Sequence, residues 1–232
     1  MDSSPSARFA ASKKRVSHPE FQNFVSNLSF TPDEFQIEAC HALEDGFGVL
    51  VAAPTGAGKT VVGEFATFLA YERGKKVFYT TPIKALSNQK YSEFVERYGS
   101  DHVGLLTGDV SVNGEAPIVV MTTEVLRNMI YAGSNTLENL GFVVLDEVHF
   151  LGDKFRGAVW EEILIHLPQE IPVISLSATV SNVEEFGEWL STVRGEIRVI
   201  LSETRPVPLH QYVLQGNDFF PLLSEGSSPI RI

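Results

Sequence analysis

Short apolar runs rich in valine and isoleucine alternate along this chain with longer amphipathic segments. The amphipathic segments at 59–74, 84–99 and 183–195 are helix-like, and each ends in glycine, as helices often do. Runs so short and so apolar are typical of buried strands. The alternation predicts an α/β fold, a mostly parallel twisted sheet with helices on both faces. The six apolar runs lie at 48–54, 76–82, 116–122, 142–147, 172–179 and 197–202.

The chain divides into three expected regions. Residues 1–20 are low in hydrophobicity and rich in Ser, Ala and Lys, which predicts a disordered tail. Their basic cluster is followed by no apolar core, so they do not read as a secretory signal. Residues 21–202 are expected to form the α/β domain. Prolines then interrupt the alternation, and residues 203–232 are expected to be a linker that leaves the domain.

Composition narrows the class of protein. With 232 residues, 44% of them hydrophobic, the chain can bury a core that needs no disulfide. Cys40 is its single cysteine, which suits a reducing interior, and we expect a cytoplasmic monomer. No apolar stretch approaches the roughly 20 residues that span a bilayer, so we expect no membrane contact. The net charge of −11 argues against coating nucleic acid by an overall positive field, but leaves room for a local basic strip.

A glycine-containing turn follows the first apolar run, in "VLVAAPTGAGKTVVGEF". The backbone N–H groups of such a turn can cradle phosphate oxygens beside a helix N-terminus. Lys59 would reach the β- and γ-phosphates, and the Thr60 hydroxyl would bind Mg²⁺. Ala53 replaces the first glycine of the G-x-x-x-x-G-K-[ST] pattern. The alternative is a glycine-rich turn before a charged helix start. The expected nucleotide-binding turn comprises Thr55, Gly56, Ala57, Gly58, Lys59 and Thr60.

Another apolar run ends in two acids, Asp146 and Glu147. Burying adjacent carboxylates costs several kcal/mol unless a partner compensates. We expect Asp146 at a neighbouring strand end, holding Mg²⁺ through water, and Glu147 orienting and polarising the water that attacks the γ-phosphate. With Lys59, these are the predicted catalytic residues. Taken alone, the acid pair would be interpreted as an ordinary solvated helix start.

Several segments together resemble a known family. "APTGAGKT", "DEVH" and "SAT" resemble the motifs of superfamily-two helicases. "TTPIKALSNQKYSEF", "LLTGDV", "MTTEVLRNMI" and "DEVHFLGDKFRGAVWEE" resemble the Ski-like DEVH-box RNA helicases, and the bacterial HelY-type above all. The resemblance spans about residues 28–215. It implies a P-loop RecA-like domain, the first of two, that uses ATP and Mg²⁺ to move along and unwind RNA.

The resemblance also implies an adenine-reading segment, "FTPDEFQ". Phe30 would stack on the base and Gln36 would bond its edge, because an amide both donates and accepts. The family usually has proline before the second phenylalanine, where this chain has Glu34 and carries its proline earlier, at Pro32. The alternative for Phe30 is ordinary core packing.

Coupling and nucleic-acid residues are implied in the same way. His149, which the resemblance also places among the catalytic residues, would act with Ser177, Ala178 and Thr179 of "SAT" to couple the two sites, the histidine bonding one of the hydroxyls. Loop hydroxyls, amides and a few cations would grip the nucleic-acid backbone without reading bases. Each loop residue could also be a simple cap, as "TTE" before an apolar helix would be. The implied nucleic-acid residues are Thr81, Pro82, Lys84, Gly108, Asp109, Thr122, Thr123 and Glu124.

Phosphoryl transfer usually needs an arginine as well, which the family supplies from a second RecA-like domain. The sequence has no such element, so we expect ATP and ADP binding with slow or negligible turnover. Two alternatives stay open. The first is a DNA helicase or translocase, which only a preference for the 2′-hydroxyl would distinguish from an RNA helicase. The second is a nucleotide- and RNA-binding module without turnover. A guanine-nucleotide switch would need an "NKxD" pattern, which is absent.

Overall fold

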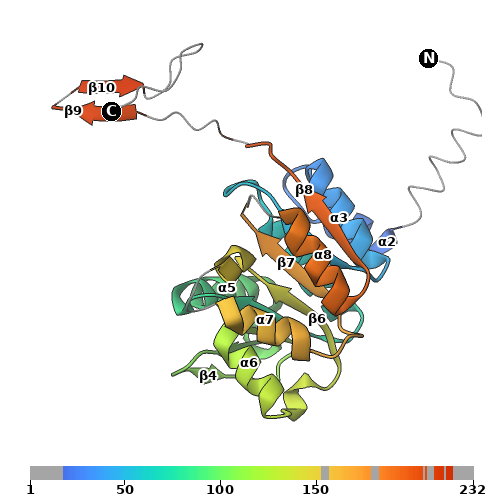
Figure 1. Cartoon of the computed structure of the whole chain (residues 1–232). Coiled ribbons are helices and arrows are strands. Elements are labelled where there is room, and N and C mark those ends of the chain that lie inside the picture. Colours follow the sequence, from blue (N-terminus) through green and yellow to red (C-terminus); the bar gives the residue numbers. More distant parts are fainter. Residues whose placement is uncertain are drawn as a thin grey trace, which may run out of the picture.

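The computed structural model of the chain describes residues 18–152, 157–178, 183–205, 207, 212–216 and 218–221. Within them an eight-stranded sheet has the order β4-β3-β5-β2-β6-β7-β1-β8. Figure 1 shows this sheet with helices packed against it. Its neighbouring strands are parallel except β3 and β4. The expected α/β fold is confirmed. The strands are β1 (Gly48–Ala52), β2 (Lys76–Thr81), β3 (Val103–Leu106), β4 (Ser111–Val112), β5 (Ile118–Thr122), β6 (Leu140–Leu145), β7 (Val173–Ser177) and β8 (Ile197–Leu201).

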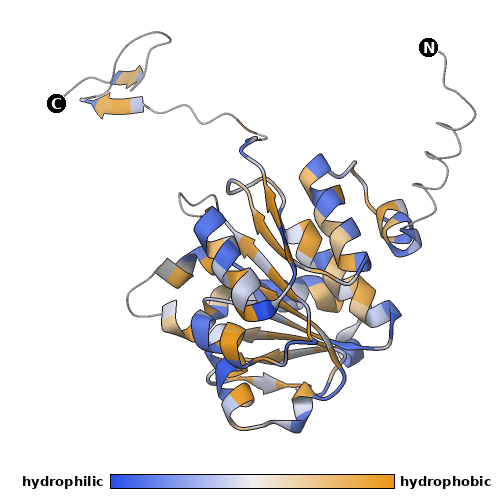
Figure 2. Ribbon diagram, turned by 45° about the vertical axis from the view of Figure 1, so that its right-hand side comes forward, coloured by the Kyte–Doolittle hydropathy of each residue, from blue (hydrophilic) through white to orange (hydrophobic). Residues whose placement is uncertain are grey.

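Helices cover both faces of the sheet. Side chains alternate along β1, so that Val49 joins one core cluster with Phe65 of α4, and Leu50 joins a second with Trp160 of α7. Figure 2 shows the hydrophobic strands between helices whose outer sides are hydrophilic. The first cluster also holds α3 and α5, and the second holds α6 and α8. The helices are α2 (Pro19–Ser26), α3 (Glu34–Glu44), α4 (Thr60–Glu72), α5 (Lys84–Tyr98), α6 (Thr123–Tyr131), α7 (Gly157–His166) and α8 (Val183–Arg194), with short 3₁₀ turns at Ser100–His102, Asn135–Leu137 and Val148–Gly152.

All six expected strands and three expected helices form, within a few residues of their expected bounds. One boundary and two strands differ from the prediction. Helix α2 begins at Pro19, inside the expected tail, because Phe21 and Phe24 lie one helical turn apart and both pack on Phe65 of α4. The sequence reading also missed strands β3 and β4, which are too short for a clear pattern.

Part of the region expected to be a linker forms a hairpin. Strands β9 (Tyr212–Gln215) and β10 (Asp218–Pro221) pair antiparallel and make a separate two-stranded sheet. Their residues are exposed, including the large apolar side chains of Leu214 and Phe219. None of the helices among the described residues has the length and apolar character that crossing a bilayer requires.

Candidate nucleotide and nucleic-acid sites

The turn between β1 and α4 has the geometry expected of a phosphate loop. Gly56 and Gly58 have φ of 84° and 81°, in the left-handed region that favours glycine. Ala57 between them is buried, whereas Thr55 and both glycines are exposed. Ala53 is fully buried and is not among the residues with positive φ, so alanine is accommodated where the pattern has glycine.

Lys59 turns back onto its own loop. Its Nζ donates to the carbonyl oxygen of Ala53 at 2.8 Å and to that of Pro54 at 3.2 Å. Burial lowers the pKa of Lys59, and the charges of Glu147 and Asp146 oppose that shift. Those charges act because the lysine lies near the end of β6. We expected Asp146 at the strand end next to the phosphate loop. This was wrong, because β7 lies between β6, which precedes Asp146, and β1, which precedes the loop.

The carboxylate of Asp146 is held at both oxygens. Oδ1 accepts from the backbone N–H of Glu147 at 2.9 Å, and Oδ2 accepts from the hydroxyl of Tyr79 at 3.0 Å. Burial raises the pKa of Asp146, the charge of Glu147 raises it further, and the Tyr79 hydrogen bond opposes both. Sequence reasoning missed Tyr79, whose only signal is a hydroxyl-bearing aromatic inside an apolar run.

A Mg²⁺ ion fits this donor set. Burial and the charge of Glu147 disfavour the charged form of the Asp146 carboxylate, and a nearby cation would stabilise that form. In the part of the chain that the structure describes, no group of three or more His, Cys, Asp or Glu side chains could hold a metal by itself. Mg²⁺ matches so sparse a set, because it usually keeps several waters and binds one or two protein ligands plus phosphate oxygens. Asp146 and Thr60 would be those ligands.

Glu147 adopts φ of 57°, the left-handed region that a residue with a long side chain seldom occupies. Such strain is commonly found at functional sites. Its Oε2 lies 3.2 Å from Nδ1 of His149. The hydroxyl of Ser177 donates to the carbonyl oxygen of Ala178 at 2.8 Å. Thr179 lies outside the described residues, so the expected coupling through the histidine stays a prediction.

The segment expected to read adenine lies directly against the phosphate loop. Gln36 is only 3% exposed; its Oε1 accepts from the backbone N–H of Asp33 at 2.8 Å, and its Nε2 donates to the carbonyl oxygen of Gly58 at 2.9 Å. The first bond belongs to a capping box, which "DEFQ" signals in the sequence. Phe30 is 49% exposed, so the core-packing alternative is wrong, and its stacking role stays a prediction.

The three expected nucleic-acid loops meet at one edge, because β3, β5 and β2 are neighbours and the loops follow their ends. The Thr123 hydroxyl donates to the carbonyl oxygen of Thr81 at 3.2 Å, which joins two of the loops. Nζ of Lys84 pairs with Oδ2 of Asp109, which joins the third. No side-chain cap bond forms at Thr122, the N-cap of α6, so the simple-cap alternative is not supported.

Exposure separates these loop residues into two sets. Lys84, Gly108 and Asp109 are exposed, and Thr122 and Glu124 are half-buried. Thr81, Pro82 and Thr123 are buried, so their side chains hold the loops together. The sequence did not reveal two further residues that support these loops. The hydroxyl oxygen of Ser87 lies 2.7 Å from that of Thr81, and the hydroxyl of Thr107 donates to the carboxylate of Asp109 at 3.0 Å.

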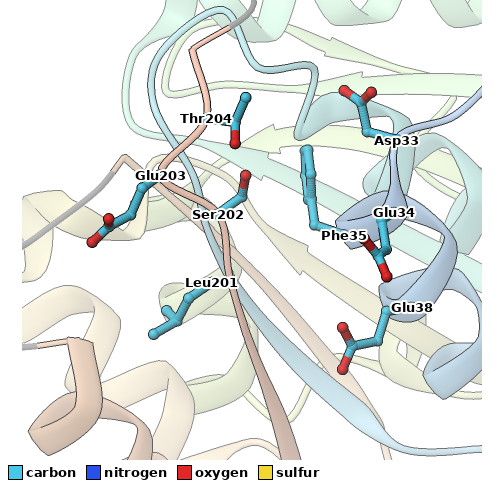
Figure 3. Close-up of a pocket in the computed structure, with 8 residues that line it drawn as sticks. All are labelled: Asp33, Glu34, Phe35, Glu38, Leu201, Ser202, Glu203 and Thr204. Atoms are coloured by element: carbon cyan, nitrogen blue, oxygen red, sulfur yellow. The ribbon is translucent and has the colours of Figure 1, made fainter.

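A hollow of about 500 Å³ lies between the start of α3 and the segment after β8 (Figure 3). Four carboxylates line it, which would repel a triphosphate, so it is not a site for the phosphates of a nucleotide. The lining residues are Asp33, Glu34, Phe35, Glu38, Leu201, Ser202, Glu203 and Thr204.

Comparison with known proteins decides the family. Residues 33–186 match the DEAD/DEAH box helicase family over more than half of the chain. The chain belongs to the DEAD/DEAH box helicases. It is 63% identical over 203 residues to "Probable helicase HelY" of Mycobacterium tuberculosis, covering 88% of this chain and 22% of that protein. It is 46% identical to "Antiviral helicase SKI2" of Saccharomyces cerevisiae, covering 88% of this chain and 16% of that one.

These similarities confirm the resemblance to the Ski-like superfamily-two helicases of the HelY type. Among solved structures, "DUF1998 helicase MrfA bound to DNA" superposes with a TM-score of 0.63 at 21% identity, covering 80% of this chain and 29% of that one. That likeness shows the RecA-like helicase fold. The chain spans about a fifth of the length of the HelY proteins it matches.

Proposed function

We propose that this chain is the ATP-binding, first RecA-like domain of an ATP-dependent RNA helicase, which couples hydrolysis of Mg-ATP to movement along RNA and to its unwinding. One observation carries the proposal: the phosphate loop with Lys59 follows β1, and Asp146 and Glu147 follow β6, at the same edge of one parallel sheet. A cation for the phosphates, a carboxylate for the metal and a carboxylate for water are the groups that ATP hydrolysis needs.

Each group has a task that its position supports. Lys59 would leave the carbonyl oxygens of Ala53 and Pro54 for the β- and γ-phosphates, because charged oxygens are stronger acceptors than neutral ones. Mg²⁺, when bound by Asp146 and Thr60, would neutralise charge on the phosphate oxygens. Glu147 would orient the attacking water. Its neighbour His149 would hold that carboxylate in place.

RNA is the favoured substrate. A relative that is 47% identical over 212 residues is named "DExH-box ATP-dependent RNA helicase DExH15 chloroplastic", from Arabidopsis thaliana, and this chain covers 18% of it. A DNA helicase or translocase is the second candidate, because the MrfA structure of the same fold contains DNA. Loops that grip a sugar-phosphate backbone do not separate the two by themselves.

We further propose that the chain alone binds nucleotide with slow or negligible turnover. The arginine that stabilises charge on the γ-phosphate would come from a second RecA-like domain of the same protein. By itself the chain would then behave as a nucleotide- and RNA-binding module that separates no strands.

Nucleotide binding is the first test. We expect the chain to bind a fluorescent ADP or ATP analogue, and Lys59→Ala to weaken that binding at least tenfold. Lys84→Ala, an exposed lysine on the nucleic-acid loop, is the matched control and should leave affinity unchanged. A folded chain that binds no adenine nucleotide would contradict the proposal.

Steady-state ATP hydrolysis, alone and with single-stranded RNA or DNA of equal length, is the second test. RNA-stimulated turnover that disappears in Glu147→Gln would support catalysis by this domain and select RNA, but it would overturn the proposal that the chain alone has slow or negligible turnover. Greater stimulation by DNA would favour the second candidate. ADP binding without turnover would agree with a domain that lacks its partner's arginine.

A further inference from the structure

Tyr79 is a fully buried tyrosine whose hydroxyl contacts Asp146. It lies in β2, opposite Val144 of β6, and its side chain is 0% exposed. Its hydroxyl donates to Oδ2 of Asp146 at 3.0 Å. A phenylalanine would pack as well here, so burial in the core does not by itself account for the hydroxyl.

The ring is clamped by two helices. Residue 63 of α4 is glycine, and a Cβ there would come within 2.9 Å of the Tyr79 ring, so α4 lies directly over it. The ring of Phe94, on α5, meets it edge-on at 5.5 Å between centroids. Nζ of Lys90, also on α5, lies 5.5 Å from its centroid. The hydroxyl therefore has little freedom to move away from Asp146.

Charged side chains hold Lys90 in this position. Lys90 is 8% exposed, and its Nζ lies 3.4 Å from Oε1 of Glu64 on α4 and also pairs with Glu93. Arg97 contacts the other oxygen of Glu64 at 3.2 Å. Glu64 belongs to the helix that starts at the phosphate loop. The clamp thus joins α4 and α5 around the tyrosine that contacts Asp146.

We propose that Tyr79 is a positioning residue for the Mg²⁺ site, and that its clamped hydroxyl fixes the Asp146 carboxylate in the orientation that receives the metal. This inference rests on the proposed function. With one oxygen bonded to the N–H of Glu147 and the other to Tyr79, the carboxylate cannot rotate, while each oxygen keeps a lone pair. Groups that orient a metal ligand in this way typically change metal affinity about 10–100-fold when they are removed.

Tyr79→Phe tests the inference because it removes one oxygen atom and keeps the ring. Affinity for the fluorescent nucleotide would be measured in EDTA and across a MgCl₂ titration. We expect affinity in EDTA within about twofold of wild type, and the MgCl₂ concentration for half-maximal effect raised about tenfold. Tyr98→Phe is the matched control. Its ring packs on Phe94 and Tyr71, and we expect its MgCl₂ response to match wild type.

A double variant shows whether Tyr79 acts through Asp146. We expect Asp146→Asn to remove most of the MgCl₂ response, and Tyr79→Phe to add nothing further in that background.

The failure modes are distinct. A wild-type chain that binds no nucleotide contradicts the proposed function. A wild-type chain that responds to MgCl₂, beside a Tyr79→Phe variant with the same midpoint, overturns the positioning role alone. A Tyr79→Phe chain that unfolds, or loses affinity equally in EDTA and in MgCl₂, assigns the hydroxyl to stability and also overturns it.

Discussion

The side-chain amide of Gln36 donates a hydrogen bond to the backbone carbonyl of Gly58, with 2.9 Å between Nε2 and the oxygen. The other end of the amide accepts from the N–H of Asp33, so one side chain ties the start of α3 to the phosphate loop. The contact is close enough that a Cβ on Gly58 would lie 2.7 Å from Nε2. Gly58 therefore has two reasons to be glycine, its positive φ and this neighbour.

Gly58→Ala and Gly56→Ala should separate those two reasons. Both residues have positive φ, so each alanine costs about 1–2 kcal/mol of backbone strain. Nothing lies within 4 Å of a Cβ on Gly56, whereas Gly58→Ala must also displace Gln36. We expect Gly58→Ala to lower the free energy of unfolding by about 1 kcal/mol more, measured by urea titration. Adding Gln36→Ala should remove that excess, and equal losses in the two single variants would contradict the account.

Asp146→Asn should stabilise the metal-free chain at neutral pH. Burial and Glu147 raise the pKa of Asp146 above its ordinary value of 3.8. The neutral carboxyl therefore contributes stability below that value, and this contribution is lost as pH rises through the raised pKa. Relative to wild type, the variant should therefore gain stability as pH rises from below 3.8 through the raised pKa of Asp146. Urea unfolding in EDTA measures this, and a difference that does not change with pH would contradict it.

Arg194→Ala should destabilise the domain without touching nucleotide binding. Arg194, 7% exposed at the end of α8, donates to the carbonyl oxygens of Pro168 and Ile171, each at 2.7 Å, and to that of Leu167. Removing it leaves buried acceptors unpaired, at a cost of about 2–4 kcal/mol.

A control variant separates the stability loss in Arg194→Ala from the effect of losing any arginine charge. Arg198 is an exposed arginine, 3.5 Å from Glu196, and Arg198→Ala should cost about 1 kcal/mol or less. Thermal unfolding gives the stability change, and fluorescent-nucleotide binding below the unfolding temperature gives the affinity. A loss of affinity in the folded Arg194→Ala chain would count against a purely structural role.

Asp109→Asn should strengthen binding of single-stranded RNA. In the structure Asp109 pairs with Lys84, the exposed lysine of the nucleic-acid loops. Neutralising the acid frees that cation for phosphate, so we expect several-fold tighter binding at low salt and a smaller gain at high salt. Fluorescence anisotropy with labelled RNA at several salt concentrations measures both.

Glu115→Gln is the matched control for Asp109→Asn, because Glu115 pairs with Lys76 at the opposite ends of the strands. It should leave affinity for RNA unchanged. Weaker binding by Asp109→Asn would mean that the carboxylate itself contacts RNA.

The sequence by itself determined the elements whose signals are local. A buried strand needs a short apolar run and a phosphate loop needs glycine at positive φ, so β1, Gly56 and Gly58 were predictable from neighbouring residues alone. The same holds for Asp146 and Glu147 at the end of an apolar run. Short or surface elements carry weaker signals, which is why β3, β4 and the β9–β10 hairpin were missed.

Only the tertiary structure decided which residues meet. Insertion of β7 between β6 and β1, the bond from Gln36 to Gly58 and the hydroxyl of Tyr79 on Asp146 each join segments far apart in the chain. Local periodicity reports which face a side chain takes, but not which strand or helix lies opposite it. Which strand or helix lies opposite depends on how whole layers pack. Because of that packing, Tyr79, a tyrosine in an apolar run, contacts Asp146, the proposed metal ligand.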